Sequence, residues 1–329
     1  MSRPDAVMSP VDISCAFATS MATPEHVVLA EQLGYRRAWL YDSPALYPDV
    51  WMILAECARR TSSIELGPGV AVPSLRHPMV TAAAVGTLVA LAPGRVNLAL
   101  GSGFTGRLTL GKKPLAWRLV RDYVITLRSL LAGDTVEWEG ARIRMMHSDG
   151  FGAARPVEVP LLLGTGGPKG SAVAKELAAG VFVTSPVRGF NSCSVLTIGT
   201  VLDHGEDPGS DRAFDAAGHA GALAHHALHL RGDVSALPGG DVWLAALAEF
   251  PESERHLALH EGHLISANPR DRLVVTGQTL SRFGYAREAD AWRAHIAVQA
   301  EAGATEIAYQ PAGADIPGEL RRFMAAARG

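Results

Sequence analysis

The sequence predicts an α/β fold, specifically a TIM (β/α)₈ barrel with insertions. Short apolar runs alternate with helical segments along most of the 329 residues. Four strand-then-helix units occupy roughly the first hundred residues, and eight candidate strands are present in all. Such alternation is typical of a parallel sheet with crossover helices. An open doubly wound sheet is the alternative, and the eight strands favour the barrel.

The first four units are bounded by residues that start and stop helices. Thr23 is a predicted N-cap before Pro24, and Gly34 ends that helix. Asp49 is the predicted cap of a second helix that extends to Arg60. The strands of these units are predicted over Val11–Phe17, Arg37–Tyr41, Ile64–Val72 and Arg95–Leu100, and the third helix over Pro78–Leu91.

The rest of the chain continues the alternation with two interruptions. After a helix over Trp117–Leu131, we expect a hairpin insertion near 132–150 that turns at Glu139-Gly140. A helical insertion is expected near 204–300. We place both insertions on the carboxyl-terminal rim of a single domain over 1–329. The remaining strands are predicted over Val159–Leu163, Val181–Thr184, Ser194–Leu202 and Glu306–Tyr309, and the remaining helices over Pro168–Ala179 and Pro317–Ala327.

Composition limits the classes of partner. Apolar residues make up 48% and charged residues 19% of the chain, which is enough for a large core. The formal net charge of −3 provides no long-range positive field to collect a nucleic acid. The N-terminal segment has no apolar signal region, and the apolar stretch 79–92 is too short to span a bilayer. Three isolated cysteines indicate reduced, buried thiols, which are typical of a cytoplasmic protein. Together with the charge and the absence of a membrane span, this composition predicts no membrane or nucleic-acid partner.

Three short motifs match known sites only in part. GSGFTG at 101–106 matches a dinucleotide-binding pattern, but the following RLTLGKKP does not suit the helix that this pattern requires, so a glycine-rich rim loop is favoured. GRLTLGKK at 106–113 matches a P-loop except that Lys113 replaces the magnesium-binding serine or threonine. HEGH at 260–263 has its second histidine one position too early for a zinc protease. We expect no metal site, and structural or solvated roles for these histidines and for His225, His226 and His229.

The turn after the Val159–Leu163 strand is a candidate anion site. Gly164-Thr165-Gly166-Gly167 ends the strand, and Pro168 begins a helix. Free backbone N–H groups at a helix start, with the positive end of the helix dipole, suit a phosphate or a carboxylate. An ordinary tight strand–helix loop is an equal alternative, because it also favours glycine.

Asp42 follows the second strand in WLYDSP. In a barrel this position is on the ligand-facing rim, where a carboxylate could accept a hydrogen bond from a ligand. The alternative is a turn or N-cap aspartate before Pro44.

Ordered motifs in the chain resemble the luciferase-like monooxygenase superfamily, and within it the coenzyme F420-dependent reductases and dehydrogenases. The motifs are AWLYDSP at 38–44, LGPGVAVPSLRHP at 66–78, LAPGRVNLALGSGFTGR at 91–107, GTGGPKG at 164–170 and HEGHLISANPRDR at 260–272. The resemblance covers roughly Thr23 to Phe182. It implies a luciferase-like barrel, commonly a homodimer, with a flat tricyclic cofactor across its carboxyl-terminal mouth.

The resemblance also implies where the cofactor, F420 or alternatively FMN, would bind. Asp42 would contact the ring, and a non-proline cis peptide in the third strand would back it. The loop after the fourth strand would flank the ring, and the Gly-Gly-Pro turn would contact its phosphate. The implied positions are Asp42, Gly69, Val70, Gly101, Ser102, Gly103, Thr165, Gly166, Gly167 and Pro168.

Two positions depart from the sugar-phosphate dehydrogenases of this branch. Ser43 and Phe104 stand where those enzymes carry a histidine and a glutamate, which argues against a sugar-phosphate substrate. We expect hydride transfer between the deazaflavin and a small organic substrate. His147 is the candidate proton donor, with a buried structural role as its alternative. The alternative functions are an FMN-dependent monooxygenase supplied by a separate flavin reductase, and a non-catalytic ligand-binding barrel.

Overall fold

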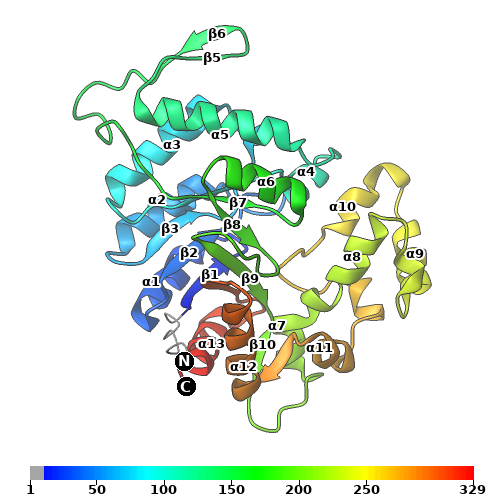
Figure 1. Cartoon of the computed structure of the whole chain (residues 1–329). Coiled ribbons are helices and arrows are strands. Elements are labelled where there is room, and N and C mark those ends of the chain that lie inside the picture. Colours follow the sequence, from blue (N-terminus) through cyan, green and yellow to red (C-terminus); the bar gives the residue numbers. More distant parts are fainter. Residues whose placement is uncertain (1–10) are drawn as a thin grey trace, which may run out of the picture.

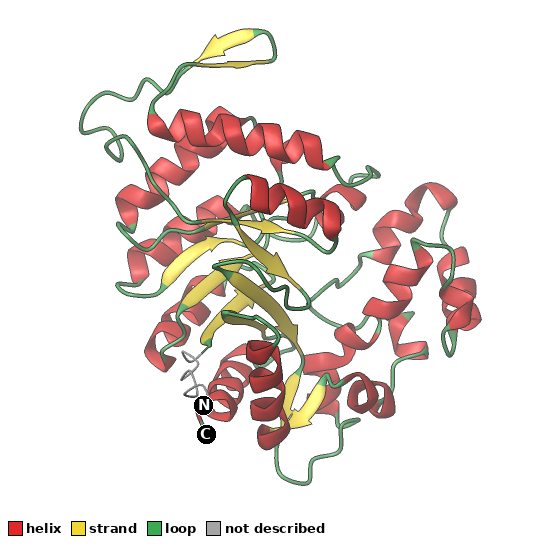
Figure 2. Cartoon of the chain, viewed as in Figure 1, coloured by secondary structure: helices red, strands yellow, loops and turns green. Residues whose placement is uncertain are grey.

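In the computed structural model, which describes residues 11–329, eight parallel strands form a nearly closed barrel (Figures 1 and 2). The strand order is β3-β2-β1-β12-β9-β8-β7-β4, and every neighbouring pair is parallel. The predicted TIM barrel is therefore confirmed. The barrel strands are β1 (Asp12–Phe17), β2 (Arg37–Leu40), β3 (Glu65–Pro68), β4 (Leu98–Gly101), β7 (Leu161–Gly164), β8 (Gly180–Val183), β9 (Cys193–Ile198) and β12 (Glu306–Gln310).

The barrel closes between β3 and β4 through two separated contacts. Parallel bridges join Leu66 to Val96 and Ala71 to Leu100. Between these bridges, a Cβ atom at Gly67 would lie 2.2 Å from the Asn97 carbonyl oxygen, so this close approach requires glycine. A cis peptide bond joins Gly69 to Val70, as the resemblance implies.

Helices cover the outside of the barrel (Figure 2). Asp49 caps α2 by accepting two backbone N–H bonds, and Gly34 ends α1 with φ 81°, as predicted. Thr23 differs from its prediction, because it is the first residue of α1 and its hydroxyl accepts a bond from the Ser20 N–H at 2.8 Å. The covering helices are α1 (Thr23–Leu33), α2 (Val50–Arg60), α3 (Pro78–Leu91), α5 (Trp117–Ala132), α6 (Pro168–Glu176), α12 (Ala289–Glu301) and α13 (Ile316–Arg328).

The hairpin insertion is present, but not on the predicted rim. β5 (Val136–Trp138) and β6 (Ala141–Ile143) pair antiparallel around Glu139 and Gly140, whose φ values are 52° and 79°. The hairpin follows the C-terminus of α5 and precedes the start of β7, so it joins the barrel wall at its amino-terminal end and projects outward (Figure 1). A connection from a helix to the next strand lies at that end because all barrel strands are parallel.

The helical insertion does follow the carboxyl-terminal end of β9. Its helices form a lobe beside the barrel (Figure 1): α7 (Asp211–Gly221), α8 (Leu223–His229), α9 (Gly240–Ala248), α10 (Arg255–Leu259) and α11 (Gly277–Phe283). The predicted strand Ser194–Leu202 is interrupted at Gly199, where a Cβ atom would lie 2.3 Å from the Tyr285 carbonyl oxygen. Beyond it, β10 (Thr200–Leu202) pairs with β11 (Ala286–Glu288), a strand that the sequence did not predict.

Other sequence predictions concern cysteines and membrane segments. Cys15, Cys57 and Cys193 are buried and free of disulfides, as expected. None of the helices in residues 11–329 is long and apolar enough to cross a membrane. The prediction that the N-terminus carries no signal region rests mostly on residues 1–10, which lie outside the described part of the chain.

A largely buried ionic network lies at the amino-terminal end of the barrel interior. Arg37 binds Glu65 at 2.5 Å and Glu306 at 2.6 Å. Glu306 also accepts a bond from the Trp39 indole N–H at 3.1 Å, and Asn97 donates to Glu65 at 2.9 Å. Further toward the carboxyl-terminal end, the interior holds an apolar cluster that includes the Trp39 ring.

We expect Arg37→Ala to lower the free energy of unfolding by about 3–5 kcal/mol, because Glu306 would keep a buried charge without its cation. The Glu306 side chain is only 4% exposed. Urea unfolding measures the change. In the control Arg60→Ala, which removes exposed pairs with Glu25 and Glu56, the change should be less than about 1 kcal/mol. Equal effects of the two substitutions would contradict this assignment.

Candidate functional site

The floor of the barrel mouth consists of backbone and one apolar side chain. Gly101 of β4 and Gly164 of β7 are register partners. A Cβ atom at either glycine would lie 2.7 Å from a methyl group of Val70, so the Val70 side chain covers both positions. A Cβ atom at Gly69 would lie 2.9 Å from the Cβ of Trp39. These three glycines keep the floor free of projecting side chains, which suits one face of a flat ring.

Asp42 lies beside this floor with a buried carboxylate. Its Oδ2 accepts bonds from the Arg76 guanidinium at 2.7 Å and from the Val72 N–H at 3.3 Å. Arg76 also binds Asp49 at 2.8 Å. Burial raises the pKa of Asp42, and the Arg76 charge opposes that rise. The side chain thus bonds to the loop between β3 and α3 and does not cap the turn before Pro44.

The glycine-rich loop after β4 packs against the same loop. Gly103 has φ 79°, and a Cβ atom there would lie 2.4 Å from Val72. A five-residue helix, α4 (Phe104–Leu108), begins directly after it, which corrects the expectation that no helix follows the GSG sequence. The dinucleotide-binding alternative is nevertheless wrong, because the sheet closes into a barrel. The P-loop alternative is also wrong, because segment 106–113 begins within α4.

The turn from β7 to α6 adjoins the floor at Gly164. Thr165 is buried, and its hydroxyl donates to the Gly167 carbonyl at 3.1 Å. No side chain caps α6, and a Cβ atom at Gly166 or Gly167 would have no neighbour within 4 Å. The start of α6 is therefore open, with its positive dipole end available to an anion.

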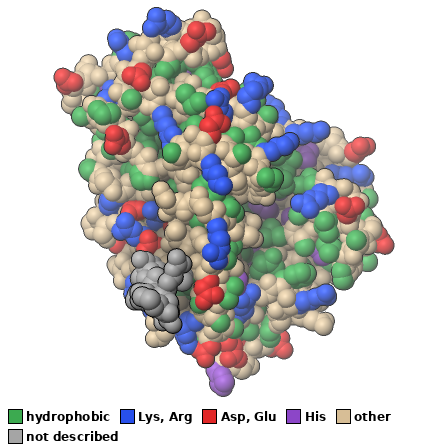
Figure 3. Space-filling model, in the orientation of Figure 1, with side chains coloured by type: hydrophobic (Ala, Val, Ile, Leu, Met, Phe, Trp, Pro, Cys, Tyr) green, Lys and Arg blue, Asp and Glu red, His purple; other side chains and the backbone are tan. Residues whose placement is uncertain are grey.

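The helical insertion covers another side of the mouth through His263 and Leu264. The His263 carbonyl accepts a bond from the Tyr47 hydroxyl at 2.7 Å, and its Nε2 lies 3.3 Å from the Thr105 hydroxyl. Gln310, at the end of β12, donates to the Leu264 carbonyl at 3.0 Å. His263 and Leu264 thus contact the segment after β2, helix α4 and the last residue of β12. Figure 3 shows a hollow between the barrel and the lobe, with hydrophobic and histidine side chains along it.

Further histidines form a buried cluster behind His263. Burial lowers the pKa values of His219 and His260 to about 4. Burial, followed by the nearby imidazoles, lowers the pKa of His263 well below its usual range. These rings are therefore neutral at pH 7. Within residues 11–329, no group of three or more histidine, cysteine, aspartate or glutamate side chains is arranged to hold a metal ion.

His226 takes part in this cluster with a defined partner. Its Nε2 lies 3.2 Å from the Asp271 carboxylate, and the Trp243 indole N–H donates to the same oxygen at 2.9 Å. His226 also stacks on His263 with ring centroids 6.1 Å apart. His226 therefore has a hydrogen-bond partner within the lobe, whereas His263 bonds to Thr105 in the segment after β4.

The structure brings together most of the predicted site residues, with one exception. The mouth of the barrel contains Asp42, Gly69-Val70, residues 101–103 and residues 165–168. His147 does not, because it is exposed in the segment between β6 and β7, at the amino-terminal side of the wall. The sequence analysis missed Tyr41 and Gln310, which lie at or just after strand ends, and Thr105 in α4. It assigned His263 a structural or solvated role only.

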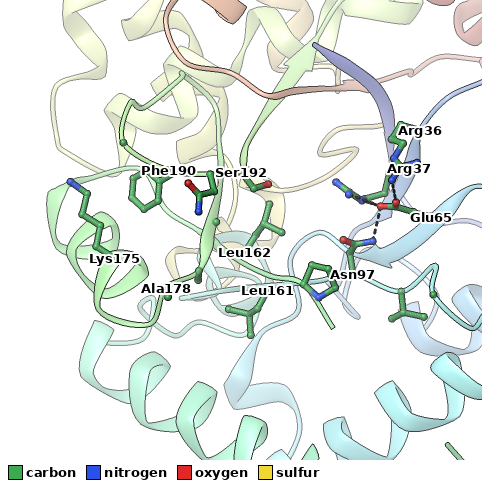
Figure 4. Close-up of a pocket in the computed structure, with 17 residues that line it drawn as sticks. Arg36, Arg37, Glu65, Asn97, Leu161, Leu162, Lys175, Ala178, Phe190 and Ser192 are labelled. Carbon is green, nitrogen blue, oxygen red and sulfur yellow. Dashed lines mark hydrogen bonds and ion pairs between the residues drawn. The ribbon is translucent and has the colours of Figure 1, made fainter. Parts of the chain in front are cut away.

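A separate cavity of about 580 Å³ lies at the amino-terminal end of the barrel (Figure 4). One wall carries Arg36, Arg37, Glu65 and Asn97, whose side chains already pair with one another. Lys175 stands on the other wall. This end of a TIM barrel serves stability, so the mouth is the functional candidate.

A family model described as luciferase-like monooxygenase matches residues 15–190, more than half of the chain. The chain is 32% identical over 165 residues to 5,10-methylenetetrahydromethanopterin reductase of Methanolobus tindarius, with 48% of each protein covered. It is 30% identical over 172 residues to F420-dependent glucose-6-phosphate dehydrogenase of Microbacterium testaceum, covering 48% of this chain and 51% of that protein. The chain thus spans about half the length of the curated relatives it matches.

Solved structures resemble the chain over almost its whole length. The coenzyme F420-dependent tetrahydromethanopterin reductase from Methanopyrus kandleri has a TM-score of 0.64 at 17% identity, covering 97% of this chain and 98% of that one. The oxygenating constituent of 3,6-diketocamphane monooxygenase from Pseudomonas putida, in complex with FMN, has a TM-score of 0.60 at 13% identity and the same coverage. These likenesses show the fold.

We expect the free energy of unfolding to fall as the pH is lowered from about 6.5 to 4. His219 and His260 titrate near 4 in the folded protein, against an ordinary 6.5, so the unfolded chain binds more protons in this window. Their contribution is fully present above pH 6.5 and is lost as the pH falls towards 4. Urea unfolding at pH 7, 6 and 5 measures the slope. His219→Gln should flatten it and the exposed control His204→Gln should not; an unchanged slope in His219→Gln would refute the assignment.

Proposed function

Because this chain belongs to the luciferase-like monooxygenase family, we propose that it is a coenzyme F420-dependent oxidoreductase that transfers a hydride between the deazaflavin and a small organic substrate. The observation that carries the proposal is the mouth itself, in which a floor of glycines and Val70 adjoins an open helix N-terminus. That combination matches a flat ring with an anionic tail. The choice of F420 is supported by relatives named as F420-dependent or as methylenetetrahydromethanopterin reductases.

The residues at the mouth fit this cofactor. Val70, with Gly101 and Gly164 beneath it, would back the ring, and Asp42 would stand at its edge. The backbone N–H groups around Gly166 and Gly167 would bind the phosphate of the tail. When bound, the deazaflavin supplies a carbon centre that gives or accepts a hydride.

The chain's own contribution is to bind, orient and shield. Arg76 holds Asp42 in position, and the packing of Val72 against Gly103 joins the loops after β3 and β4. The insertion places His263 and Leu264 over the mouth, where they would exclude water from the reacting groups.

We also propose that the protein acts as a homodimer in the cytoplasm.

FMN-dependent monooxygenation is the second candidate. It is favoured by the FMN-containing barrel of similar fold, since the floor would accept either tricyclic ring. A non-catalytic barrel is the third candidate, and its distinguishing property would be the absence of binding to either cofactor.

Titration of the purified protein with oxidised F420 and with oxidised FMN separates these functions. We expect saturable binding of F420, followed by its absorbance and fluorescence, with at least tenfold weaker binding of FMN. Tighter binding of FMN would favour the monooxygenase, and binding of neither would contradict the proposal.

Gly166→Ala and Gly167→Ala test the phosphate position. Space is available at both sites, so folding should be unaffected, but the added methyl group would obstruct the anion. We expect F420 binding to weaken about tenfold or more, because a charge-assisted hydrogen bond contributes roughly 1.5–3 kcal/mol. The matched control is Gly86→Ala within α3, which also meets no neighbour within 4 Å and should leave the affinity unchanged. Unchanged affinity in both turn variants would contradict the assigned position.

A further inference from the structure

The proposed hydride transfer needs a group that exchanges a proton with the substrate, and the predicted residues do not supply it. By the resemblance described above, Ser43 and Phe104 stand where the sugar-phosphate dehydrogenases carry a histidine and a glutamate. His147 is exposed at the other end of the barrel wall. The Asp42 carboxylate is bound by Arg76.

His263 is the imidazole that the fold brings to the mouth. Its Nε2 lies 3.3 Å from the hydroxyl of Thr105, which is two residues after Gly103 in the loop expected to flank the ring. The Tyr47 hydroxyl fixes its backbone through the bond to the His263 carbonyl. The residue is half-buried, and its Nδ1 is buried without a hydrogen-bond partner in the described residues.

Tyr41 adds a second unpaired polar group, and it packs in the same apolar cluster as Leu264, the residue after His263. It directly precedes Asp42, is 6% exposed, and packs with Val70 and Leu264 in the apolar cluster of the barrel interior. Its hydroxyl finds no partner among residues 11–329. The Tyr41 ring lies 6.3 Å from that of Tyr47, which bonds to His263. A buried hydroxyl without a partner is costly, so this group points to a ligand that accepts its hydrogen bond.

We propose that His263 is the acid–base residue of this site and that the substrate is an alcohol, or the corresponding carbonyl compound, whose oxygen binds between His263 and Tyr41. This inference rests on the proposed function. A neutral imidazole suits the role of base in alcohol oxidation, and the low pKa of His263 keeps the ring in that form at pH 7. Thr105 is a positioning residue that orients the ring.

The reaction balances without another reactant. In oxidation, the C–H bond of the carbinol carbon breaks and its electron pair leaves with the hydrogen as a hydride to the oxidised deazaflavin. The O–H bond breaks, its proton passes to His263, and the C–O bond becomes a carbonyl. The alcohol loses two electrons and the deazaflavin gains two. Carbonyl reduction is the reverse and requires a protonated His263, which the low pKa of this ring disfavours at pH 7, so oxidation is the expected direction.

The first test is carbethoxylation of histidines by diethyl pyrocarbonate, mapped by mass spectrometry with and without F420. We expect His263 to be modified in the free protein and at least fivefold more slowly with F420 bound. The exposed His147 should react equally in both states and serves as the internal control. Binding of F420 with unchanged modification of His263, or no modification of His263 in either state, would overturn this inference alone. Failure to bind F420 would contradict the proposed function as well.

The second test compares variants with a panel of primary and secondary alcohols and their carbonyl counterparts, followed by F420 absorbance. With the compound that the wild type converts, His263→Gln should lower kcat on the order of 100-fold and keep F420 affinity within twofold. His263→Ala should regain activity with added imidazole. The control is His229→Gln, in the outer part of the cluster, which should keep the wild-type rate. Reaction with no member of the panel, or a His263→Gln rate within threefold of wild type, would overturn the proposal.

Discussion

The approach of Val70 to two glycines is the contact on which the mouth of this barrel depends. Val70 stands over Gly101 and Gly164 at a distance that leaves no room for a Cβ atom at either position. The contact ties the end of β3 to β4 and β7, next to the place where the barrel closes. It also removes side chains from the floor, so the same packing that completes the barrel creates a surface for a flat ligand.

Polar groups around this floor are divided by their state of ionisation. On the side of β2 and β3, charged groups are paired in the chain Asp42–Arg76–Asp49. On the side of the insertion, the nearest groups are neutral imidazole, hydroxyl and amide side chains, which can exchange protons and hydrogen bonds with a bound molecule. The site thus has paired charges on one side and, on the other, neutral groups that can exchange protons with a bound molecule.

The two ends of the barrel have separate tasks. At the amino-terminal end, Arg37, Glu65 and Glu306 satisfy one another and fill the interior. At the carboxyl-terminal end, no side chain caps the start of α6, and the hydroxyl of Tyr41 has no partner among residues 11–329. An uncapped helix start and an unpartnered hydroxyl next to a floor of glycines suit a binding site.

Local chemistry made much of this protein predictable from sequence. Helix α3 has the predicted bounds, Asp49 is the cap of α2, and the hairpin turns at Glu139-Gly140, because periodicity, caps and turns depend on residues a few positions apart. Tertiary structure alone decided that the hairpin lies on the wall, that β11 pairs with β10, and that His263 meets Thr105, 158 positions away. Those contacts depend on how distant segments pack, and the free energy of that packing cannot be deduced from residues that are close in sequence.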